Sequence, residues 1–300
     1  MTIIEKINRL RREKNALILA HNYQRIPVQD IADHRGDSLQ LSVLSSKSKS
    51  DLIVFCGVRF MAETAAILKP SAKVLLPVKD AGCPMADMIT ASQLKEFKAQ
   101  HPGAPVVCYV NSSVEVKAES DVCCTSSNAV KVLRSFPKDQ TILFVPDRHL
   151  GTWAARQSGR KVIVWEGACP VHECGFTRRQ LDRLRRKHPD FELLAHPECS
   201  DDIVLEADHV LSTGGMMKYA QKNDRLIIAT DASFTDYLNH LYPKKQFIAL
   251  NTRARCLDMR KTTLRDVLNA LETEQYHVKV PQNIADKAVR SLNRMLEIST

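Results

Sequence analysis

Short apolar runs rich in β-branched residues alternate with helical patterns along the whole chain. Runs such as ALILA (16–20) and LIIA (226–229) contain no polar residue. Continuous apolar strands separated by helices are typical of parallel sheets that are covered by helices on both faces. The pattern therefore predicts an α/β protein built on parallel sheets.

Three classes of segment recur along the chain in the same order. The first is an apolar strand that ends in a polar cluster: ALILAHNY (16–23), PVVCYVNS (105–112) and FELLAHPE (191–198). The second is an Asp followed by an apolar run and a small-residue loop that opens a helix: 50–63, 120–132 and 207–219. The third is a strand that ends in a cysteine loop: 73–85, 161–172 and 246–259. The second and third copies each add a strand that ends in Asp: 141–147 and 226–231.

The cysteines that close the three copies are almost evenly spaced. Cys169 follows Cys83 by 86 residues, and Cys256 follows Cys169 by 87 residues. We therefore predict three homologous α/β/α sandwich domains with parallel sheets around a pseudo-threefold axis. The first would comprise residues 1–84 together with C-terminal helices in about 257–300, the second residues 85–170 and the third residues 171–256.

The polar clusters all follow predicted strands at their carboxyl ends, where parallel sheets bind their ligands. Three units facing one axis would direct these loops into one central cleft. The amphipathic segment 283–298, which follows Pro281, is expected to pack on the first unit beside the N-terminal helix.

Charge and composition narrow the possible partners. Lys and Arg exceed Asp and Glu by 9, which suits anionic metabolites or nucleic acid. The one dense basic run, 178–189, has helical spacing and few aromatic neighbours, so a solvated helix face is favoured and no nucleic-acid partner is expected. The charged N-terminus lacks the apolar segment of a signal peptide, and no apolar stretch is long enough to span a bilayer. We expect a cytoplasmic protein with no membrane partner.

The nine cysteines are odd in number and include no C-x-x-C pair, which argues for reduced thiols. Three thiolates meeting at one axis would suit a [4Fe–4S] cluster with one open, Lewis-acidic iron. His172 lies three residues after Cys169, so a Cys₃His zinc site is an alternative. Three unrelated buried cysteines are the other alternative.

Two further groups of residues carry candidate chemistry. The loops CTSSN (124–128) and STGG (212–215) precede helices, where backbone N–H groups and hydroxyls can hold phosphate or carboxylate. The polar strand ends supply proton donors and acceptors of the kind used in acid–base catalysis. These residues are His21, Asn22, Tyr23, Tyr109, Asn111, His196 and Glu198.

Specific segments of the chain resemble the quinolinate synthase family, an iron–sulfur enzyme of NAD biosynthesis. They include LAHNYQ, GDSLQL, GVRFMAETAAIL, CPMA, PVVCYVNSS, TSSNAV, PDRHLG, CPVH, HPEC and STGGM, and they extend over nearly the whole chain. The resemblance implies three α/β/α domains around one [4Fe–4S] cluster per chain. It also implies condensation of iminoaspartate with dihydroxyacetone phosphate to quinolinate, phosphate and water. The partners would be these small anionic substrates and the enzyme that supplies iminoaspartate.

The resemblance also assigns roles to residues. It implies Cys83, Cys169 and Cys256 as cluster ligands and Tyr23 and Glu198 as acid–base residues, with His21, Tyr109 and His196 as further catalytic candidates. The implied substrate-binding residues are His21, Ser38, Tyr109, Asn111, Ser126, His172, His196, Glu198, Ser212 and Thr213.

Two features depart from the family pattern. Cys256 lies in RARCLDMRKTTL without a C-x-x-C, so the chain resembles a shorter form. Asp231 stands where the family leads us to expect Glu. A zinc-dependent lyase or aldolase acting on phosphorylated substrates remains an alternative, as does a non-catalytic protein that binds phosphorylated metabolites.

Overall fold

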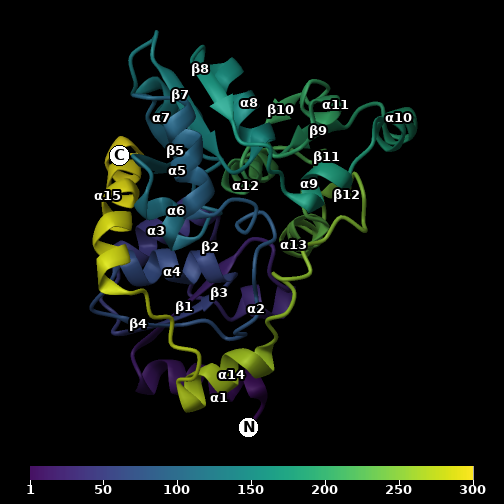
Figure 1. Ribbon diagram of the computed structural model, residues 1–300. Helices are drawn as coiled ribbons and strands as arrows, with labels where there is room; N and C mark the ends of the chain where they lie inside the picture. Colours follow the sequence, from purple (N-terminus) through teal and green to yellow (C-terminus); the bar gives the residue numbers. More distant parts are fainter. Residues whose placement is uncertain (300) are drawn as a thin grey trace.

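The computed structural model describes residues 1–299 and contains three separate four-stranded sheets (Figure 1). All strand pairs within the sheets are parallel. Each sheet has the same strand order, in which the second strand in sequence lies at one edge and the fourth at the other. The fold is therefore α/β, with three α/β/α units of one topology.

The first sheet has the order β2-β1-β3-β4. Its strands are β1 (Ala16–His21), β2 (His34–Gly36), β3 (Leu52–Cys56) and β4 (Lys73–Leu75). The helices in this part of the chain are α1 (Ile3–Glu13), α2 (Ile26–Asp30), α3 (Ser38–Lys47) and α4 (Arg59–Leu68). Helices α1 and α3 begin with capping boxes, at Thr2 with Glu5 and at Asp37 with Gln40, which satisfy the first free N–H groups of each helix.

The second sheet has the order β6-β5-β7-β8. Its strands are β5 (Val106–Tyr109), β6 (Val122–Cys124), β7 (Thr141–Val145) and β8 (Lys161–Val164). The accompanying helices are α5 (Ala91–Gln100), α6 (Val114–Ala118), α7 (Ala129–Arg134), α8 (Arg148–Ser158) and α9 (Pro170–Cys174).

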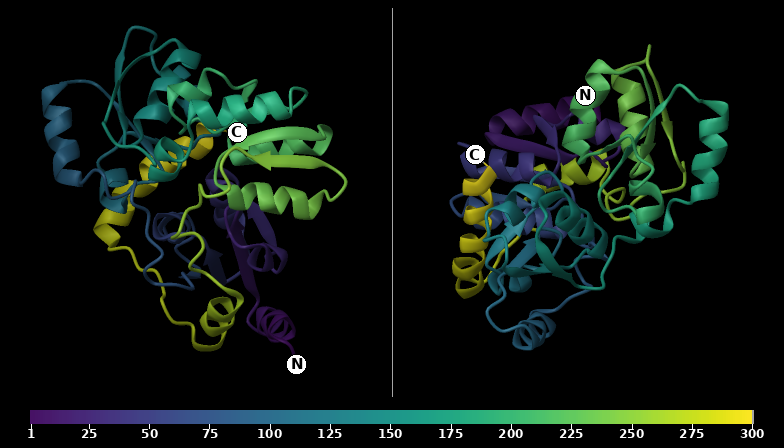
Figure 2. Two further views of the ribbon diagram at one scale, coloured as in Figure 1. Left: turned by 90° about the vertical axis from the view of Figure 1, so that its right-hand side faces the viewer. Right: turned by 90° about the horizontal axis from the view of Figure 1, so that it is seen from above.

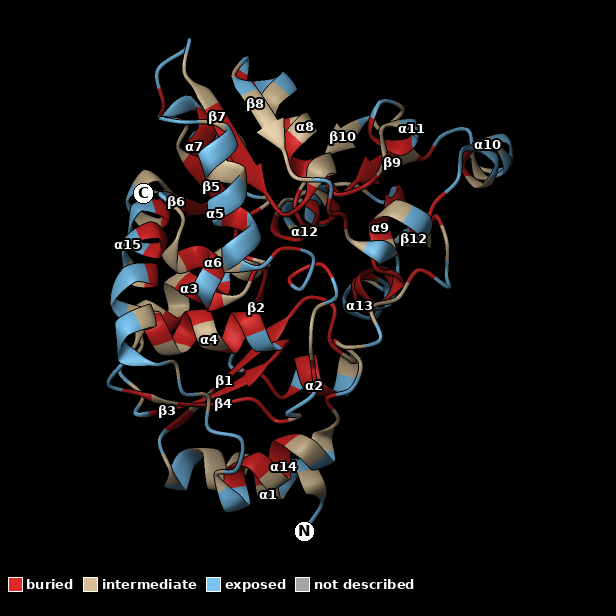
Figure 3. Ribbon diagram, in the orientation of Figure 1, coloured by how far each residue is buried: buried red, intermediate tan, exposed pale blue. Residues whose placement is uncertain are grey.

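The third sheet has the order β10-β9-β11-β12. Its strands are β9 (Glu192–Ala195), β10 (His209–Val210), β11 (Arg225–Ala229) and β12 (Gln246–Ala249). Its helices are α10 (Arg178–Lys187), α11 (Asp201–Val204), α12 (Thr213–Lys222) and α13 (Ala232–Leu241). The basic helix α10 projects outward with Leu181 as its buried residue, as expected for a solvated helix face (Figure 3).

The structure corrects one step of the repeat assignment. The predicted equivalence of 50–63 with 120–132 and 207–219 is wrong, because β3 (Leu52–Cys56) occupies the place of β7 and β11, not of β6 and β10. The equivalent of β6 and β10 is β2, a three-residue edge strand of sequence His-Arg-Gly with two exposed positions. A polar edge strand this short has no apolar run, so its hydrophobic pattern does not reveal it.

The C-terminal helices also differ from expectation. Helix α14 (Leu264–Thr273) packs on α1, but α15 (Gln282–Ser299) packs on α6, β6, α7 and α4. The prediction that segment 283–298 lies beside the N-terminal helix is therefore wrong. Figure 1 shows α15 running along the side of the second unit, far from α1 and α14. The helix thus connects the first and second units.

The first and third strands of each sheet are almost entirely buried, whereas the edge strands β2, β8 and β10 and the outward faces of the helices are more exposed (Figure 3). Seen from above, the units surround a common centre (Figure 2). Because the sheets are parallel, each contributes its strand-end loops at one edge, and these loops meet at that centre.

Candidate active site

A cavity between the three units is lined by residues from all of them. Its volume is about 630 Å³, which includes space open to solvent. The predicted residues that line it are His21, Tyr23, Ser38, Cys83, Tyr109, Asn111, Ser126, Cys169, His172, His196, Glu198, Thr213 and Cys256. Ser212 does not line the cavity, and its hydroxyl caps the start of α12. The strand-end residues that were scattered in sequence therefore meet in one place.

The strand register shows that these residues occupy equivalent backbone positions. His21 pairs with Gly36 and Tyr109 with Cys124 across neighbouring strands, and His196 follows the pair formed by Ala195 and Val210. The site therefore consists of threefold sets: His21, Tyr109 and His196; Tyr23, Asn111 and Glu198; Ser38, Ser126 and Thr213; and the three cysteines.

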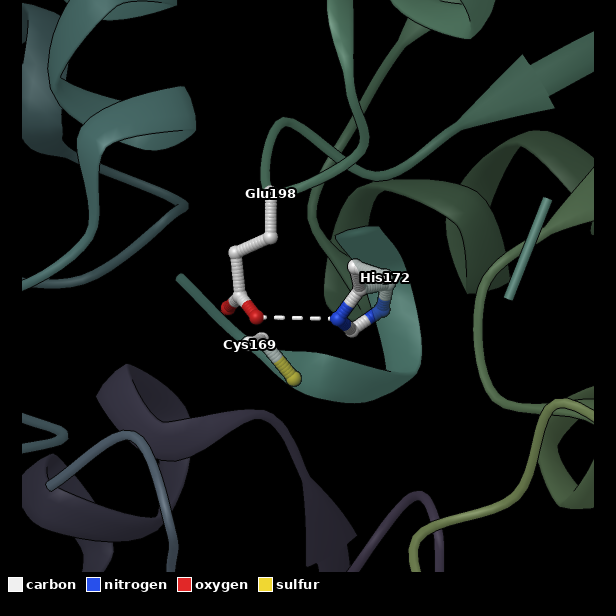
Figure 4. A group of neighbouring side chains, drawn as sticks. All are labelled: Cys169, His172 and Glu198. Carbon is white, nitrogen blue, oxygen red and sulfur yellow. Dashed lines mark ion pairs between the residues drawn. The ribbon is translucent and has the colours of Figure 1, made fainter. Parts of the chain in front are cut away.

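A chain of buried polar side chains crosses the cavity, joined by hydrogen bonds except at His172 Nδ1, which makes no hydrogen bond among residues 1–299 and lies only at ion-pair distance from Glu198. Tyr109 donates its hydroxyl to Glu198 Oε1 at 2.5 Å, and the other Glu198 oxygen lies 2.9 Å from His172 Nδ1 (Figure 4). His172 Nε2 lies 2.9 Å from Thr230 Oγ1, which in turn lies 2.5 Å from the Tyr23 hydroxyl. This chain links one tyrosine of the first unit to one of the second through a carboxylate and an imidazole. Such an arrangement can hold and transfer protons.

Burial and the Glu198 charge determine the protonation of the site. Burial raises the pKa of Tyr23 and of Tyr109, and the Glu198 charge raises both further, so both phenols remain protonated donors. For Glu198 itself, burial acts to raise the pKa, but His172 and His196 outweigh it and hold the pKa well below its usual range. Glu198 is therefore an ionised acceptor.

Two histidines of the site, His21 and His196, are neutral near pH 7 because they are buried. Burial lowers the pKa of His21 to about 4 and that of His196 to about 3. His196 stacks on His172 with ring centroids 4.8 Å apart, and its Nε2 lies 3.2 Å from the Ser126 hydroxyl. A neutral imidazole can donate a hydrogen bond from one ring nitrogen and accept one at the other.

Hydroxyl groups at the starts of helices form another wall. Ser38 and Thr213 are the first residues of α3 and α12, and Ser126 lies in the loop before α7. Asn22 donates its side-chain amide to Thr213 Oγ1 at 3.0 Å. Asn111 Oδ1 is buried without a hydrogen-bond partner among residues 1–299 and belongs to a side chain that lines the cavity. An unpaired buried acceptor at this position indicates a ligand that donates a hydrogen bond.

The three cysteine loops lie on one side of the cavity, and their thiols are not joined by disulfides. Burial raises the pKa of Cys83 to about 12 and that of Cys256 to about 11, and it also raises the pKa of Cys169. The proximity of the other thiols adds to the effect at Cys83 and Cys169. Buried thiols gathered in this way require a cation to become thiolates.

One closer group of possible ligands lies beside them. Cys169, His172 and Glu198 have ligand atoms within 4.8 Å of one another (Figure 4). Within residues 1–299, the three loop cysteines do not form such a group, so at least one pair of their sulfur atoms is farther apart than 4.8 Å. Sulfur ligands of a single tetrahedral zinc ion lie roughly 3.8 Å apart. The four ligand atoms of a Cys₃His zinc site are therefore not gathered around one point in the part of the chain that the structure describes.

Several residues of the site escaped the sequence reasoning. Thr230 joins Tyr23 to His172, and Asp37 accepts hydrogen bonds from Ser127 at 2.5 Å and Ser212 at 3.2 Å. Asp147 is fully buried and accepts from the Cys169 N–H. Thr230 directly follows β11 and Asp147 lies two residues after β7, at strand ends that the sequence did reveal, so their position offered a signal that residue type alone did not.

The chain is similar to known quinolinate synthases over nearly its whole length. The family model described as Quinolinate synthetase A protein matches residues 5–297. The quinolinate synthase of Alkaliphilus metalliredigens is 48% identical over 99% of this chain and 98% of its own. The quinolinate synthase of Geobacter metallireducens is 50% identical with the same coverage, and that of Methanoregula boonei is 49% identical over 98% of this chain and 97% of its own. Within residues 1–299, no helix is both long and apolar enough to cross a membrane.

Proposed function

The chain belongs to the quinolinate synthetase A family, and we propose that it condenses iminoaspartate with dihydroxyacetone phosphate to give quinolinate, phosphate and water. Family membership implies an iron–sulfur enzyme of NAD biosynthesis. The observation that carries the proposal is the meeting of three half-buried cysteines with the Tyr109–Glu198–His172–Thr230–Tyr23 chain in one cavity.

A [4Fe–4S] cluster would be held by Cys83, Cys169 and Cys256. The donor set fits this group, because three thiols with no disulfide line one cavity. Three protein ligands leave one iron of a cube without a protein ligand. When bound, the cluster would supply a Lewis acid that withdraws electrons from a substrate atom.

The residues of the chain would move the protons that the condensation requires. Glu198 is ionised and lies in hydrogen-bond contact with Tyr109 and near His172, so it can accept a proton. Tyr23 keeps its proton because its pKa is raised, and it can donate to a leaving hydroxyl. Thr230 orients both Tyr23 and His172. These roles need a substrate between the two tyrosines, where the cavity lies.

The hydroxyl groups at the helix starts that line the cavity would bind the anionic groups of the substrates. Ser38, Ser126 and Thr213 offer hydroxyls at or near helix starts, where free N–H groups favour a carboxylate or phosphate. His21 and His196 flank this wall as neutral hydrogen-bond donors. Asn111 can accept from an N–H or O–H group of the substrate. The enzyme that supplies iminoaspartate would be the functional partner.

We further propose that the triplicated units are 1–84, 85–170 and 171–256, and that α14 completes the first. The identical strand orders support this division. We expect the protein to act in the cytoplasm, where NAD biosynthesis takes place.

The test is anaerobic metal and sulfide analysis together with an assay of quinolinate formed from both substrates. We expect about four iron and four sulfide per chain and turnover in the wild type. Cys83→Ser should lose most iron and at least a hundredfold of the activity. Cys174→Ser is the matched control: this exposed thiol on α9 lines an outer pocket that the three cysteines share but not the cavity itself, and its loss should change neither quantity.

Three results would overturn the proposal. One zinc per chain with no sulfide would favour the lyase. Binding of phosphorylated metabolites without turnover and without metal would favour the non-catalytic binding protein. Full activity in Cys83→Ser would remove the cluster from the reaction.

A further inference from the structure

Two fully buried aspartates stand directly behind two of the cysteine loops. Asp147 follows β7, and its Oδ2 accepts the backbone N–H of Cys169 at 3.2 Å. Asp231 follows β11, and its Oδ2 accepts the backbone N–H of Cys256 at 2.5 Å. In each case the other oxygen caps the next helix, through Leu150 N–H in α8 and Ser233 N–H in α13. Both oxygens of each carboxylate are therefore used.

The two aspartates are equivalent in the triplicated fold. The residue after each one, Arg148 or Ala232, donates its N–H to the carbonyl two residues before the cysteine. In the first unit the same bond runs from Arg59 to Ala81, which places Val58 at the position of the two aspartates. Val58 directly precedes α4 and provides no side-chain cap. The position that holds an aspartate in the other two units therefore offers no carboxylate to the Cys83 loop.

The first loop is held instead by the segment that directly follows Cys256. Asp258, two residues after Cys256, accepts the N–H of Gly82 at 3.2 Å. Lys261 binds Asp258 at 2.8 Å and reaches Asp80 in the first loop, where its Nζ donates to the carbonyl oxygen at 2.6 Å and lies 3.1 Å from the carboxylate. Each cysteine loop therefore has one aspartate that accepts a backbone N–H at or next to the cysteine.

We propose that Asp147, Asp231 and Asp258 are positioning residues that fix the three cysteine loops, so that the thiols are held ready for one metal centre. The inference rests on the proposed cluster. Burying a carboxyl group away from water is costly, so a geometric role is the simplest reason to keep it there. Preorganised ligands lose less conformational freedom on binding and release the metal more slowly.

The experiment compares serine variants of the two buried aspartates with the wild type. Serine can still cap a helix, but its single hydroxyl is too short to also reach the cysteine N–H. We expect Asp231→Ser and Asp147→Ser to lose iron to an anaerobic chelator at least fivefold faster than the wild type, with reduced sulfide content. Asp258→Ala, on a partly exposed loop, should show a smaller increase in the rate.

Thr177→Ala is the matched control, because it removes the cap of α10 with no contact to a cysteine loop. Its rate of iron loss should equal that of the wild type, although its melting temperature falls. Unchanged rates in Asp258→Ala and in every aspartate variant that folds would overturn the proposal and leave the aspartates as helix caps only. A wild type without iron or sulfide would instead refute the proposed function, so the two failures are distinguishable.

Discussion

The ends of β1 and β9 have the same backbone but different chemistry. After β1, the N–H groups of Tyr23 and Gln24 bind His21 through its Nδ1 at 3.2 Å and its carbonyl at 3.0 Å. After β9, the N–H groups of Glu198 and Cys199 bind His196 in the same two ways, at 3.4 and 3.0 Å. The histidine is kept in both turns, but the residue two positions later is a phenol in one and a carboxylate in the other.

This difference shows how a triplicated scaffold acquires an asymmetric site. The repeated turn fixes where a side chain enters the cavity, and the residue type then sets its charge. Glu198 is the ionised residue among the three that occupy this turn position in the three units. Tyr109 donates a hydrogen bond to it, and His172 lies at ion-pair distance. Tyr23, with its raised pKa, is the neutral donor on the other side. One carboxylate is enough, because a second buried charge at the Tyr23 position would repel the first.

The largest expected effect follows from removing that charge. Glu198→Gln keeps the size of the side chain but abolishes the acceptor for a proton, so we expect kcat/KM for quinolinate formation to fall about a thousandfold. Glu192→Gln, at the start of the same strand, should stay within twofold of the wild type. A loss of less than tenfold in Glu198→Gln would show that the two strand ends do not differ in function as proposed.

The histidines that the two turns share predict a pH effect on stability. Below about pH 6.5 the unfolded chain takes up protons at His21 and His196, but the folded protein does so only near pH 4 and 3. The free energy of unfolding must therefore decrease as the pH falls. For His21 alone the decrease between pH 7 and pH 4 is about 3 kcal/mol.

Urea unfolding of the metal-free protein at pH 7, 5 and 4 measures this decrease. His21→Gln should reduce the fall by about the same 3 kcal/mol, since glutamine does not titrate. Replacing the exposed His34 by Gln is the control and should leave the pH dependence unchanged. An identical slope in His21→Gln and the wild type would contradict the neutral, buried state of this histidine.

Much of the fold could be predicted because the parallel strands are continuous apolar runs. The polar edge strand β2 was missed, since His34 and Arg35 face solvent and carry no pattern. The position of α15 was also predicted wrongly. An amphipathic helix shows which of its faces is buried but not which surface covers it, and here the partners are α6 and β6.

The sets of site residues could be predicted because they recur at strand ends. Their interactions could not, since Tyr109 meets Glu198 across 89 residues and Tyr23 meets Thr230 across 207. The contacts of Asp231 could not be predicted either. Its carboxylate caps α13 and binds the Cys256 loop, which depends on two backbone N–H groups that a sequence does not show.

The smallest expected effect concerns the contact between the first and third units at their helix starts. A Cβ on Gly214 in α12 would lie 2.5 Å from Asp37 Oδ2, which is held in place by Ser127 and Ser212. Asp37 cannot move away without losing these bonds, so Gly214→Ala should lower the free energy of unfolding by about 1–2 kcal/mol, although alanine favours the helix. At the neighbouring Gly215 the nearest atom is Leu211 Cβ at 3.2 Å, and Gly215→Ala should stay within about 0.5 kcal/mol of the wild type. If the two alanine variants unfold at the same urea concentration, Asp37 does not hold the first unit rigidly against the third. A loss of stability confined to Gly214→Ala would show that the helix starts carrying Ser38 and Thr213 depend on this contact.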